Sequence, residues 1–590
     1  MITRLIGLIL ATTSIAASFA EEVTIYLDDY GVPHIYAETE EAGLFADGWA
    51  QAHDRLRQIL DNFARAMGKY AECFGAGEKD TNVRSDLEVL MWDHYGTAKK
   101  FYEDKLPPEF RKHNAAYIAG INRYMAEHPD EVPAWWTYGD VDVYMSVAFS
   151  RQYIWSWPLG EASEDLGRIG LKTKFDIDFR YSNEMAVAPS RSADGHAMLV
   201  IDPHLGWFGR QRYWEVRIHA DELQLSGFAT AGFPYVSLGH NDHVAWAHTT
   251  GGPDTADVYE LRLNPKDPLQ YLYDGEYRPL QTRKVSISVK GEAAPREITF
   301  YASHHGPIVS RNDNLAYAAK LSYADEVGYL ESRRRFAISH NVAEVREGLE
   351  ILQVMPQNVM VADTNGDIFY QRTGRVPIRP AGFDFSRPVN GSTSRTEWIG
   401  LHPTKDLIQV LNPKSGYMQN CNITPDVMMV GSPMEKSLYP DYIFGQPAML
   451  THQRGTRATE LLHSNPKITE QQMMEIALDQ KCYQHERWVE ELDNADAAIH
   501  RERSKDYDDA IKRVKAWDGF ARRDSNGALV YYYWRHALAE LAGKDEIVAM
   551  IKKVNNYLDL FGVPDDRSHL AKLGDAHTPT NELARIDEKE

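Results

Sequence analysis

Cysteine is scarce in this chain, and positive charge is outweighed by negative charge. Three cysteines, Cys73, Cys421 and Cys482, lie far apart among 590 residues and form no CxxC pair, which excludes a disulfide scaffold and a thiolate zinc module. Lysine and arginine total 64 against 85 aspartates and glutamates, a formal net charge of −21. Nucleic-acid binders and proteins that dock on anionic lipid need clustered positive charge, so the composition argues against both.

The signature motifs of several large enzyme classes are also missing. The sequence contains no GxSxG, HExxH, GxxxxGK[ST] or GxGxxG. These absences remove the easiest signatures of serine esterases, zincins, P-loop NTPases and Rossmann enzymes. At 43% hydrophobic and 11% aromatic residues, the chain can bury a sizeable core and is not a disordered tail. An acidic globular enzyme or binding protein remains.

The N-terminus carries a targeting pattern. Arg4 precedes an apolar run over residues 5–11, and small residues follow as far as Ala20. A basic start, a short apolar middle and a small-x-small exit predict a secretory signal over residues 1–20, cleaved after Ala20. The alternative, an uncleaved anchor, is disfavoured because the run is short for a bilayer. No later segment is long and apolar enough to span a membrane. We therefore expect a periplasmic or secreted protein.

Hydrophobic periodicity predicts helices at both ends of the chain and strands in the middle. Trp214, Val216 and Ile218 alternate with polar residues, and Asp274-Gly275 and Asn365-Gly366 are typical of tight hairpin turns. Thr469 and Gln472 form a possible capping box. The predicted helices cover 41–68, which ends at Gly68, then 108–127, 140–172, 469–500 and 504–518. Helices that flank a long run of antiparallel hairpins predict a layered α+β fold.

Two groups of histidines raise the possibility of a metal site. His240, His243 and His248 fall within nine residues, and His304-His305 adds a pair. Zinc accepts imidazole ligands. On strand-like sequence, however, spacings of three and five residues cannot all point to one face. Turn and core histidines are the favoured interpretation, and a histidine-ligated metallohydrolase stays as an alternative.

Several sequence segments, in order, cover nearly the whole chain beyond residue 20 and resemble one family. They are DYGVPHI at 29–35, GWAQAHDRL at 48–56, SNEMAV at 182–187, DPHL at 202–205, GHN at 239–241 leading to Trp246, DTAD at 254–257, HGPI at 305–308, DTNG at 363–366, WIG at 398–400, and NP at 412–413 with GYMQNCN at 416–422. Together they resemble the penicillin acylase (penicillin amidase) family of N-terminal-nucleophile hydrolases, which also contains acyl-homoserine lactone acylases.

The resemblance implies a fold and a nucleophile. The fold is the four-layer αββα arrangement of that family, and the chain is a precursor that cuts itself before a serine, which here is Ser182. A serine hydroxyl needs a nearby base, and a freed α-amine with a pKa of about 7.7–8.0 supplies one. The amide nitrogen of an uncut Ser182 cannot accept that proton, so cleavage between Tyr181 and Ser182 is predicted to activate the enzyme.

The resemblance also implies a division of the chain. Residues 1–20 form the signal, 21–172 a mostly helical small subunit, 173–181 a short spacer, and 182–590 a large subunit. The expected product is a heterodimer made from one precursor that deacylates small N-acyl amides. No nucleic-acid or membrane partner is expected.

The remaining catalytic roles follow from matching positions. An oxyanion needs donors that are held in place in advance, and these are by similarity the backbone NH of Thr250 and the side-chain amide of Asn422, with Asn420 as the alternative. His204 matches a position that contacts the nucleophile. Arg457 resembles an arginine that helps to hold the site, with Arg454 as its alternative.

A structural calcium ion is a further implication of the resemblance. Clustered oxygens suit this hard cation, and the matching residues are Asp254, Asp257, the backbone carbonyl of Ala256, and Glu164. Solvated turn aspartates are the alternative interpretation. A further acidic ligand of some family members has no obvious match here, since Pro433 falls near its place.

One position departs from the family pattern. Glycine is common before the nucleophile, whereas this chain has Tyr181. An unprocessed, inactive relative that binds acylated ligands is therefore a second alternative. The aromatic residues Tyr153, Trp155 and Trp157 match a part of the small subunit that faces the acyl group, although aromatic residues at this density are more often core.

Overall fold

The structure, a computed structural model, describes residues 5–7, 22–171, 181–210, 212–445, 451–498 and 503–541. The predicted signal lies outside the described residues except for Leu5–Gly7, and the predicted spacer lies outside them except for Tyr181. Contacts divide the chain into two compact units, which are described separately below. Unit 1 comprises 1–181, 203–365 and 370–409, and unit 2 comprises 182–202, 366–369 and 410–590.

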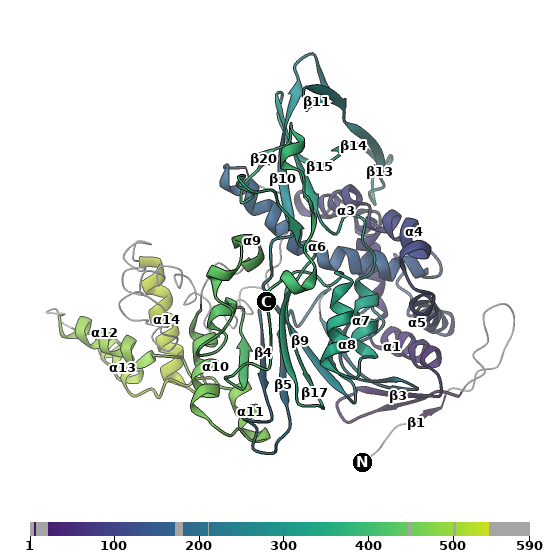
Figure 1. Cartoon of the computed structure of the whole chain (residues 1–590). Coiled ribbons are helices and arrows are strands. Elements are labelled where there is room, and N and C mark those ends of the chain that lie inside the picture. The colour runs from purple at the N-terminus through teal and green to yellow at the C-terminus, as the bar shows by residue number, and fades with distance from the viewer. Residues whose placement is uncertain are drawn as a thin grey trace. The chain divides into compact units, whose positions relative to one another are not determined.

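Unit 1 contains two large sheets and most of the long helices (Figure 1). Its helices are α1 (Glu40–Ala66), α2 (Tyr70–Phe74), η1 (Glu78–Asp80), α3 (Thr81–Trp92), α4 (His94–Lys105), α5 (Pro108–Glu127), α6 (Val143–Arg168), α7 (Tyr329–Ala337), α8 (Val342–Glu350), η2 (Ser394–Thr396) and η3 (Thr404–Asp406). Its strands are β1 (Leu5–Gly7), β2 (Thr24–Leu27), β3 (Pro33–Ala37), β6 (Tyr213–Ala220), β7 (Leu223–Thr230), β8 (Leu238–His240), β9 (Val244–Thr250), β10 (Ala256–Asn264), β11 (Asp267–Tyr273), β12 (Glu276–Pro279), β13 (Gln281–Ile287), β14 (Arg296–Ser303), β15 (Gly306–Arg311), β16 (Leu315–Leu321), β17 (Gln357–Asp363), β18 (Ile368–Thr373), β19 (Pro377–Ile378), β20 (Val389–Asn390) and β21 (Gly400–Leu401).

Helix α1 confirms the prediction for residues 41–68. The side chain of Thr39 accepts a hydrogen bond from the backbone N–H of Ala42 and caps the start of the helix. The helix ends before Gly68, whose φ of +67° suits glycine. Helix α5 crosses α1 so closely that a Cβ on Gly120 would lie 1.9 Å from a backbone oxygen of α1. Only glycine fits at this crossing.

Helix α6 confirms the prediction of a helix within 140–172. The carboxylate of Asp142 accepts from the N–H groups of Tyr144 and Met145, which fixes the first turn. Pro158 lies inside the helix and is buried. The helix nevertheless continues to Arg168, because much of one side is packed into the interior of unit 1.

The strands of unit 1 in the larger sheet have the order β1-β2-β3-β6-β7-β8-β9-β17-β18. Side chains of β6 alternate between buried and half-buried, as the sequence predicted for Trp214 to Ile218. Every residue of β17 and β18 is buried, so these strands lie at the centre of the core. Helices α1, α7 and α8 pack against this sheet on the same side in Figure 1. This arrangement holds β9, which ends at Thr250.

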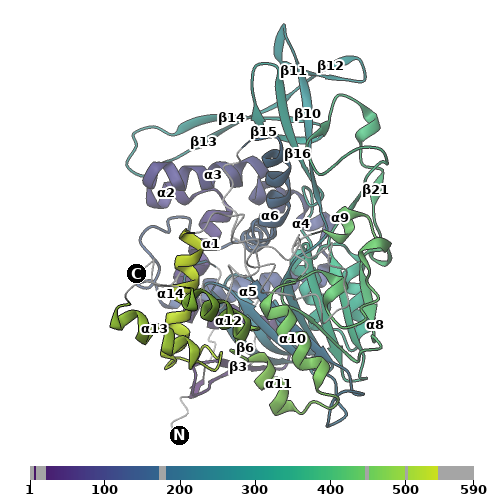
Figure 2. The same ribbon diagram turned by 90° about the vertical axis from the view of Figure 1, so that its left-hand side faces the viewer.

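The second sheet has the order β12-β11-β10-β16-β15-β14-β13, with β20 parallel to β10. Tyr259, Leu261 and Phe385 belong to its buried core. Asp274 and Gly275 join β11 to β12 with φ of +46° and +86°, which confirms the predicted hairpin turn. Figure 2 shows β13 and β14 beside α2 and α3, where Ile287 packs with residues of both helices.

Unit 2 combines a small sheet with helices, and its sheet order is β23-β4-β5. Its elements are β4 (Tyr181–Val187), β5 (Met198–His204), β22 (Gln409–Leu411), β23 (Tyr417–Asn420), η4 (Pro425–Val427), η5 (Lys436–Leu438), α9 (Asp441–Phe444), α10 (Gln453–Ser464), α11 (Glu470–Ala477), α12 (His485–Ala497), α13 (Lys505–Lys515) and α14 (Asn526–Leu541). Trp488, Trp517 and Tyr531 form the core between α12, α13 and α14.

The prediction of one helix over 469–500 is wrong. The capping box of Thr469 and Gln472 is present, but α11 ends at Ala477 and α12 begins at His485. Between them Lys481 forms a β-bridge with Phe520, and Gln484 has a φ of +58°. This pairing between distant segments therefore interrupts the helix that the periodicity predicted, because a residue in the left-handed conformation cannot continue a right-handed helix.

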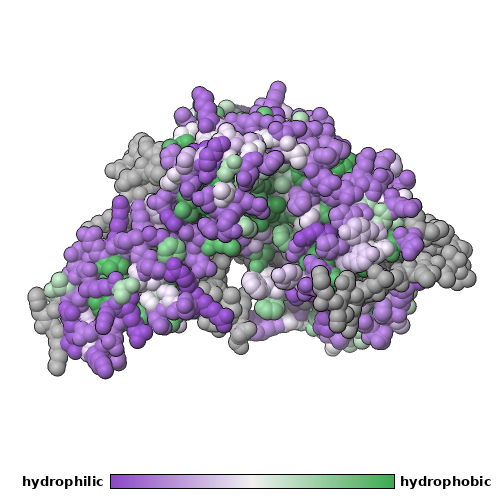
Figure 3. All heavy atoms as spheres, turned by 90° about the horizontal axis from the view of Figure 1, so that it is seen from below, coloured by the Kyte–Doolittle hydropathy of each residue, from purple (hydrophilic) through white to green (hydrophobic). Residues whose placement is uncertain are grey.

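Hydrophilic residues predominate on the face in Figure 3, and hydrophobic residues are exposed in smaller groups among them. Within the described ranges, no helix has the length and apolar character needed to cross a membrane. Helices and strands occur in both units, which confirms the predicted α+β class.

Candidate active site

Strand pairing in unit 2 places Ser182 opposite Asn422. Strands β4 and β23 run antiparallel, with Val187 opposite Tyr417 and Glu184 opposite Asn420. Two residues further along the same register, the backbone N–H of Ser182 donates a hydrogen bond to Asn422 Oδ1 at 2.9 Å. Both residues are buried. Segments 240 residues apart in sequence thus bring the predicted nucleophile to one of the two predicted oxyanion asparagines.

Asn420 supports the conformation of Asn422. Its Oδ1 accepts from the backbone N–H of Asn422 at 2.8 Å, and its Nδ2 donates to the carbonyl of Ile423 at 3.2 Å. Asn422 has a φ of +65°, a conformation that asparagine tolerates better than most residues. Asn422 is therefore the asparagine that contacts Ser182, while Asn420 holds the turn that presents it.

Arg454 binds the same serine segment. It is the second residue of α10, and its Nη1 donates to the carbonyl of Ser182 at 3.2 Å and to Asn183 Oδ1 at 2.5 Å. Its Nη2 donates to Asn422 Oδ1 at 3.1 Å. Two N–H donors on one oxygen identify that atom as the amide acceptor. The Nδ2 of Asn422 is then the atom that can donate to a substrate oxyanion.

Arg457 lies one helical turn further along α10 and has other partners. Its Nε and Nη2 bond the carboxylate of Asp479 at 3.0 and 3.1 Å, and its Nη1 bonds Glu460 at 2.7 Å. The arginine that contacts Ser182 is thus Arg454, which the family resemblance implied only as the alternative to Arg457. Arg457 connects α10 to the segment after α11.

Asn183 and Asp202 were not predicted to belong to the site. Asn183 Nδ2 donates to Asp202 Oδ2 at 2.7 Å, while its Oδ1 accepts from Arg454. The side chain next to the predicted nucleophile is therefore held from both ends. Both residues occur in segments that resemble the family, yet neither segment reveals on its own which partner its polar side chain meets.

The thiol of Cys421 is not a competing nucleophile. The residue lies between Asn420 and Asn422 and is buried. Burial raises the pKa of Cys421 to about 12, although Arg454 opposes the shift. A thiol in this state stays protonated near neutral pH and reacts poorly.

Thr250 and His204 belong to unit 1. Thr250 ends β9 opposite Gln357 of β17. The buried Asn358 donates to Thr249 Oγ1 at 2.9 Å and to the carbonyl of Thr250 at 3.3 Å, so an unpredicted asparagine fixes the end of this strand. His204 ends β5 and is half-buried. The catalytic roles of these residues stay predictions.

Three of the four predicted calcium ligands surround an arginine. Arg379 Nε lies 2.9 Å from Asp257 Oδ2, and Arg379 Nη2 lies 3.1 Å from Asp254 Oδ2 and 3.2 Å from the carbonyl of Ala256. The fourth, Glu164, is on an exposed position of α6. An added divalent ion does not fit among these oxygens as they stand, because the guanidinium already lies on them. Calcium binding itself stays a prediction.

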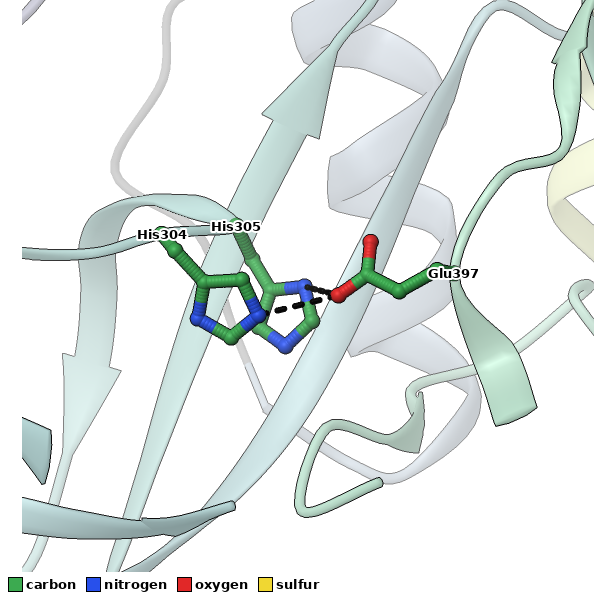
Figure 4. Close-up of side chains that lie close together, drawn as sticks. All are labelled: His304, His305 and Glu397. Carbon is green, nitrogen blue, oxygen red and sulfur yellow. Dashed lines mark hydrogen bonds and ion pairs between the residues drawn. The ribbon is translucent and has the colours of Figure 1, made fainter. Parts of the chain in front are cut away.

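His304 and His305 meet Glu397 at the tip of a hairpin (Figure 4). Among the described residues, these three form the one group whose possible metal-ligand atoms lie within 4.8 Å of one another. His304 Nε2 is hydrogen-bonded to Glu397 Oε1 at 2.9 Å, His305 Nδ1 lies 3.4 Å from the same oxygen, and Lys320 Nζ is 2.8 Å from Oε2. Although burial opposes it, the bonds from His304 and Lys320 lower the pKa of Glu397 to about 2.

The other histidines do not assemble into such a group within the described chain. His248 Nε2 lies 2.6 Å from Arg333 Nη1, and burial and this cation lower the pKa of His248 well below its ordinary value. His243 stacks on His340. A cation beside His248 opposes metal binding, so the geometry gives the metallohydrolase alternative no support.

Within unit 2, Ser182, Asn422 and Arg454 are thus joined by hydrogen bonds into one polar group. The chain matches the penicillin amidase family over residues 22–587 and belongs to that family. Membership agrees with the N-terminal-nucleophile hydrolase fold class predicted from the sequence. It also makes the chain an amide hydrolase of small acylated molecules.

In the aligned regions, the curated relatives below are 25% and 28% identical to this chain. It is 25% identical to the acyl-homoserine lactone acylase PvdQ of Pseudomonas fluorescens (strain Pf0-1), over 89% of this chain and 74% of the relative. It is 28% identical to penicillin G acylase of Escherichia coli, over 50% of this chain and 34% of the relative. A solved penicillin G acylase of Alcaligenes faecalis is 20% identical, with a TM-score of 0.49 over 69% of this chain and 79% of the other.

Proposed function

We propose that this protein is an N-terminal-serine acylase, which hydrolyses N-acyl amides after cleavage between Tyr181 and Ser182. One observation carries the proposal. The nitrogen of Ser182 is hydrogen-bonded to Asn422 Oδ1, and Arg454 bonds that same oxygen. This nitrogen is the atom that becomes a free amine on cleavage, and the arrangement already holds it beside a potential oxyanion donor.

The proposed reaction uses the freed amine of Ser182 as its own base. The neutral amine takes the hydroxyl proton as the oxygen attacks the acyl carbonyl. The oxyanion that forms accepts from Asn422 Nδ2 and, by resemblance, from the backbone NH of Thr250. The amine then gives its proton to the leaving nitrogen, and the C–N bond breaks. Water, activated by the same amine, releases the carboxylic acid from the acyl-serine.

Arg454 supports this chemistry in two ways. It fixes the amide orientation of Asn422, because it donates to Oδ1 and leaves Nδ2 to point elsewhere. Its positive charge also lies close to the Ser182 nitrogen, since both groups bond one oxygen atom. A neighbouring cation disfavours an ammonium and lowers its pKa. More of the amine is then neutral near pH 7.

The substrate class follows from the relatives as a proposal. The relatives named above are an acyl-homoserine lactone acylase and a penicillin G acylase. Both substrates are secondary amides with a small polar amine part. We expect this chain to act on one of these groups or on related acyl amides, with degradation of an antibiotic or a quorum signal as the biological outcome.

Self-cleavage is the first test of the proposal. Intact mass and N-terminal sequencing of the purified protein are expected to give fragments of roughly 18 and 47 kDa by residue count, the larger one starting Ser-Asn-Glu-Met. Ser182→Ala should stay as one chain. Ser190→Ala, which changes an exposed serine of the following turn, should be processed normally and serves as the control.

The activity test uses the processed protein. Release of fatty acid or phenylacetic acid is measured for acyl-homoserine lactones of several chain lengths, penicillin G and acyl-amino acids. One uncut chain in both the parent protein and Ser182→Ala would leave Ser182 without a free amine. The acylase mechanism would then be rejected in favour of an unprocessed relative that binds acylated ligands.

Secretion is part of the same proposal. Residues 1–20 have the pattern of a signal peptide. We expect a mature N-terminus at Glu21 and activity in the periplasmic or extracellular fraction. Fractionation of expressing cells, with sequencing of the small fragment, tests this. Activity confined to the cytoplasmic fraction, with Met1 retained, would contradict it.

A further inference from the structure

The predicted calcium ligands contact a cation that belongs to the chain itself, the side chain of Arg379. Arg379 is 7% exposed, and its guanidinium bonds carboxylates of Asp254 and Asp257 and two backbone carbonyls, those of Asp254 and Ala256. The indole of Trp398 donates to Asp257 as well. Carboxylates and carbonyls that converge are the ligand set of a divalent cation. Here the planar guanidinium of Arg379 donates hydrogen bonds to oxygens of this kind, in the place where a metal ion would bind them.

We infer that Arg379 is an internal cation that takes the place of a structural divalent ion, so that this chain holds the segment 254–257 without calcium. This segment begins four residues after Thr250, at the end of β9. The arginine ties it to the segment that contains β19, Pro377–Ile378. Arg379 is thus a positioning residue for the strand end that the proposed function uses, whereas its role as a cation does not depend on that function.

The experiment compares calcium dependence in the parent protein and in Arg379→Ala. Melting of the parent protein in 5 mM EDTA and in 5 mM CaCl₂ should differ by less than about 1 °C, because no stabilising site is formed or lost. Arg379→Ala should melt roughly 5 °C lower in EDTA, since it leaves buried carboxylates unpaired. Calcium should restore most of that loss, and magnesium much less, because Mg²⁺ demands a tighter geometry.

Arg375→Ala is the matched control. Arg375 lies in the same segment but pairs with Glu326 at 3.0 Å and bonds the carbonyl of Ser322. Its loss should lower the melting temperature without a calcium response. If Arg379→Ala does not fold, elemental analysis of the parent protein tests the inference instead, because it measures how much calcium each chain binds. One bound calcium per chain, a calcium-dependent melting temperature of the parent, or a folded Arg379→Ala that ignores calcium would each overturn the inference.

A second, independent observation concerns a positively charged cleft in unit 1. The cleft has a volume of about 1280 Å³. Its walls contain six arginines against four aspartates and glutamates. The arginines are Arg55, Arg57, Arg65, Arg84, Arg210 and Arg212. Phe208 adds exposed apolar surface, while Leu56 and Leu159 lie buried behind the wall. A positive surplus beside apolar side chains is unusual in a protein of net charge −21.

Two of these arginines repel each other in the absence of an anion. Arg55 is half-buried and adopts non-helical φ and ψ of −140° and 21° inside α1. Its buried Nε has no hydrogen-bond partner. Burial and the charge of Arg212 lower the pKa of Arg55 below its ordinary value. A buried donor without an acceptor is costly, so Arg55 Nε, with the charge of Arg212 nearby, is placed to receive an anionic group, although Arg55 Nη1 already donates to the carbonyl of Asp54.

We propose that Arg55 and Arg212 bind the carboxylate of an amphiphilic small molecule whose apolar part lies along Phe208. The ligand class rests on the proposed function, in which the released product is a carboxylic acid and an acyl-amino acid substrate carries a carboxylate of its own. The site itself would be present whether or not the chain is a hydrolase.

Calorimetric titration of the processed protein with octanoate tests the site without turnover. Octanoate should bind at least tenfold more tightly than 1-octanol, which has the same chain length and no charge. Arg55→Gln and Arg212→Gln should each weaken octanoate binding about tenfold, because a charge-assisted hydrogen bond is lost. Arg387→Gln, which alters an exposed arginine paired with Asp384, should bind octanoate as the parent does.

The outcomes separate the two proposals. Equal affinity for octanoate and 1-octanol, or normal octanoate binding by the Arg55→Gln/Arg212→Gln double variant, would overturn the carboxylate site. Neither result bears on cleavage before Ser182, which sequencing decides. Conversely, octanoate binding that depends on Arg55 and Arg212 would stand even if the chain were never cut.

Discussion

Replacement of Arg454 is the perturbation that distinguishes the site geometry most sharply. Arg454→Ala removes three hydrogen bonds, to the carbonyl of Ser182, to Asn183 Oδ1 and to Asn422 Oδ1. Without them the amide of Asn422 loses one of the two donors that orient it. Because a misplaced oxyanion donor costs about 10²–10³ in kcat, we expect kcat to fall about 10²-fold.

The same replacement should alter the pH profile. In the parent protein the guanidinium disfavours protonation of the Ser182 amine, so its removal raises the amine's pKa. The acid limb of kcat/KM should then move to higher pH by on the order of one unit, as expected for a charge a few ångströms away in a partly solvated site. Arg454→Lys keeps the positive charge but loses the paired N–H donors of the guanidinium. It should therefore restore the pH profile more fully than it restores kcat.

Arg457→Ala is the matched control on the same helix. Arg457 is partly exposed, and its ion pairs with Asp479 and Glu460 are each worth at most about 1 kcal/mol. We expect its melting temperature to fall by only ~2 °C and its kcat to stay within about twofold of the parent value. Rates are measured per processed chain, so that slower self-cleavage is not counted as slower turnover. Equal loss of kcat in both variants would refute the assignment of Arg454.

Three further predictions concern stability. Asn420→Ala should lower the free energy of unfolding by about 1–3 kcal/mol and reduce kcat, because the buried N–H of Asn422 loses its acceptor; full activity would exclude the supporting role. Burial raises the pKa of Asp47 to about 8, so the folded protein holds a proton that the unfolded chain releases near pH 4, and stability falls as pH rises from about 4 to 8. Asp47→Asn should flatten that decline in urea unfolding at pH 5 and pH 8. Gly120→Ala should cost about 3 kcal/mol because its Cβ would meet backbone at 1.9 Å, whereas Gly167→Ala, with nothing within 4 Å, should be neutral or slightly stabilising.

Local signals in the sequence predicted much of the fold. The predicted helix 108–127 coincides with α5, and 41–68 differs from α1 by one or two residues at each end. Asp274-Gly275 was predicted from turn chemistry alone and is present. These features depend on neighbours in sequence, which is why periodicity and turn residues predicted them. The segment 469–500 failed because a bridge between Lys481 and Phe520 interrupts it.

The choice between Arg454 and Arg457 was beyond the sequence for a related reason. Both arginines lie on α10, three residues apart, which is slightly less than one helical turn. Which one reaches the serine depends on how α10 is rotated against the small sheet. The predicted calcium ligands illustrate the same limit. The family resemblance implied that Asp254, Ala256 and Asp257 converge, and they do, but the cation that they meet comes from a residue more than a hundred positions later.

The antiparallel register links the two halves of the site more tightly than either motif does alone. Because β4 pairs with β23, Ser182 lies opposite Asn422 only while the register is unchanged. A slip of one residue would turn every side chain of β4 to the opposite face and would bring Ser182 opposite Cys421 or Ile423. Neither of those side chains offers a strong amide donor to an oxyanion. The pairing of β4 with β23 and the turn held by Asn420 therefore fix the chemistry as well as the fold, since they decide which residue meets the nitrogen that cleavage is proposed to free.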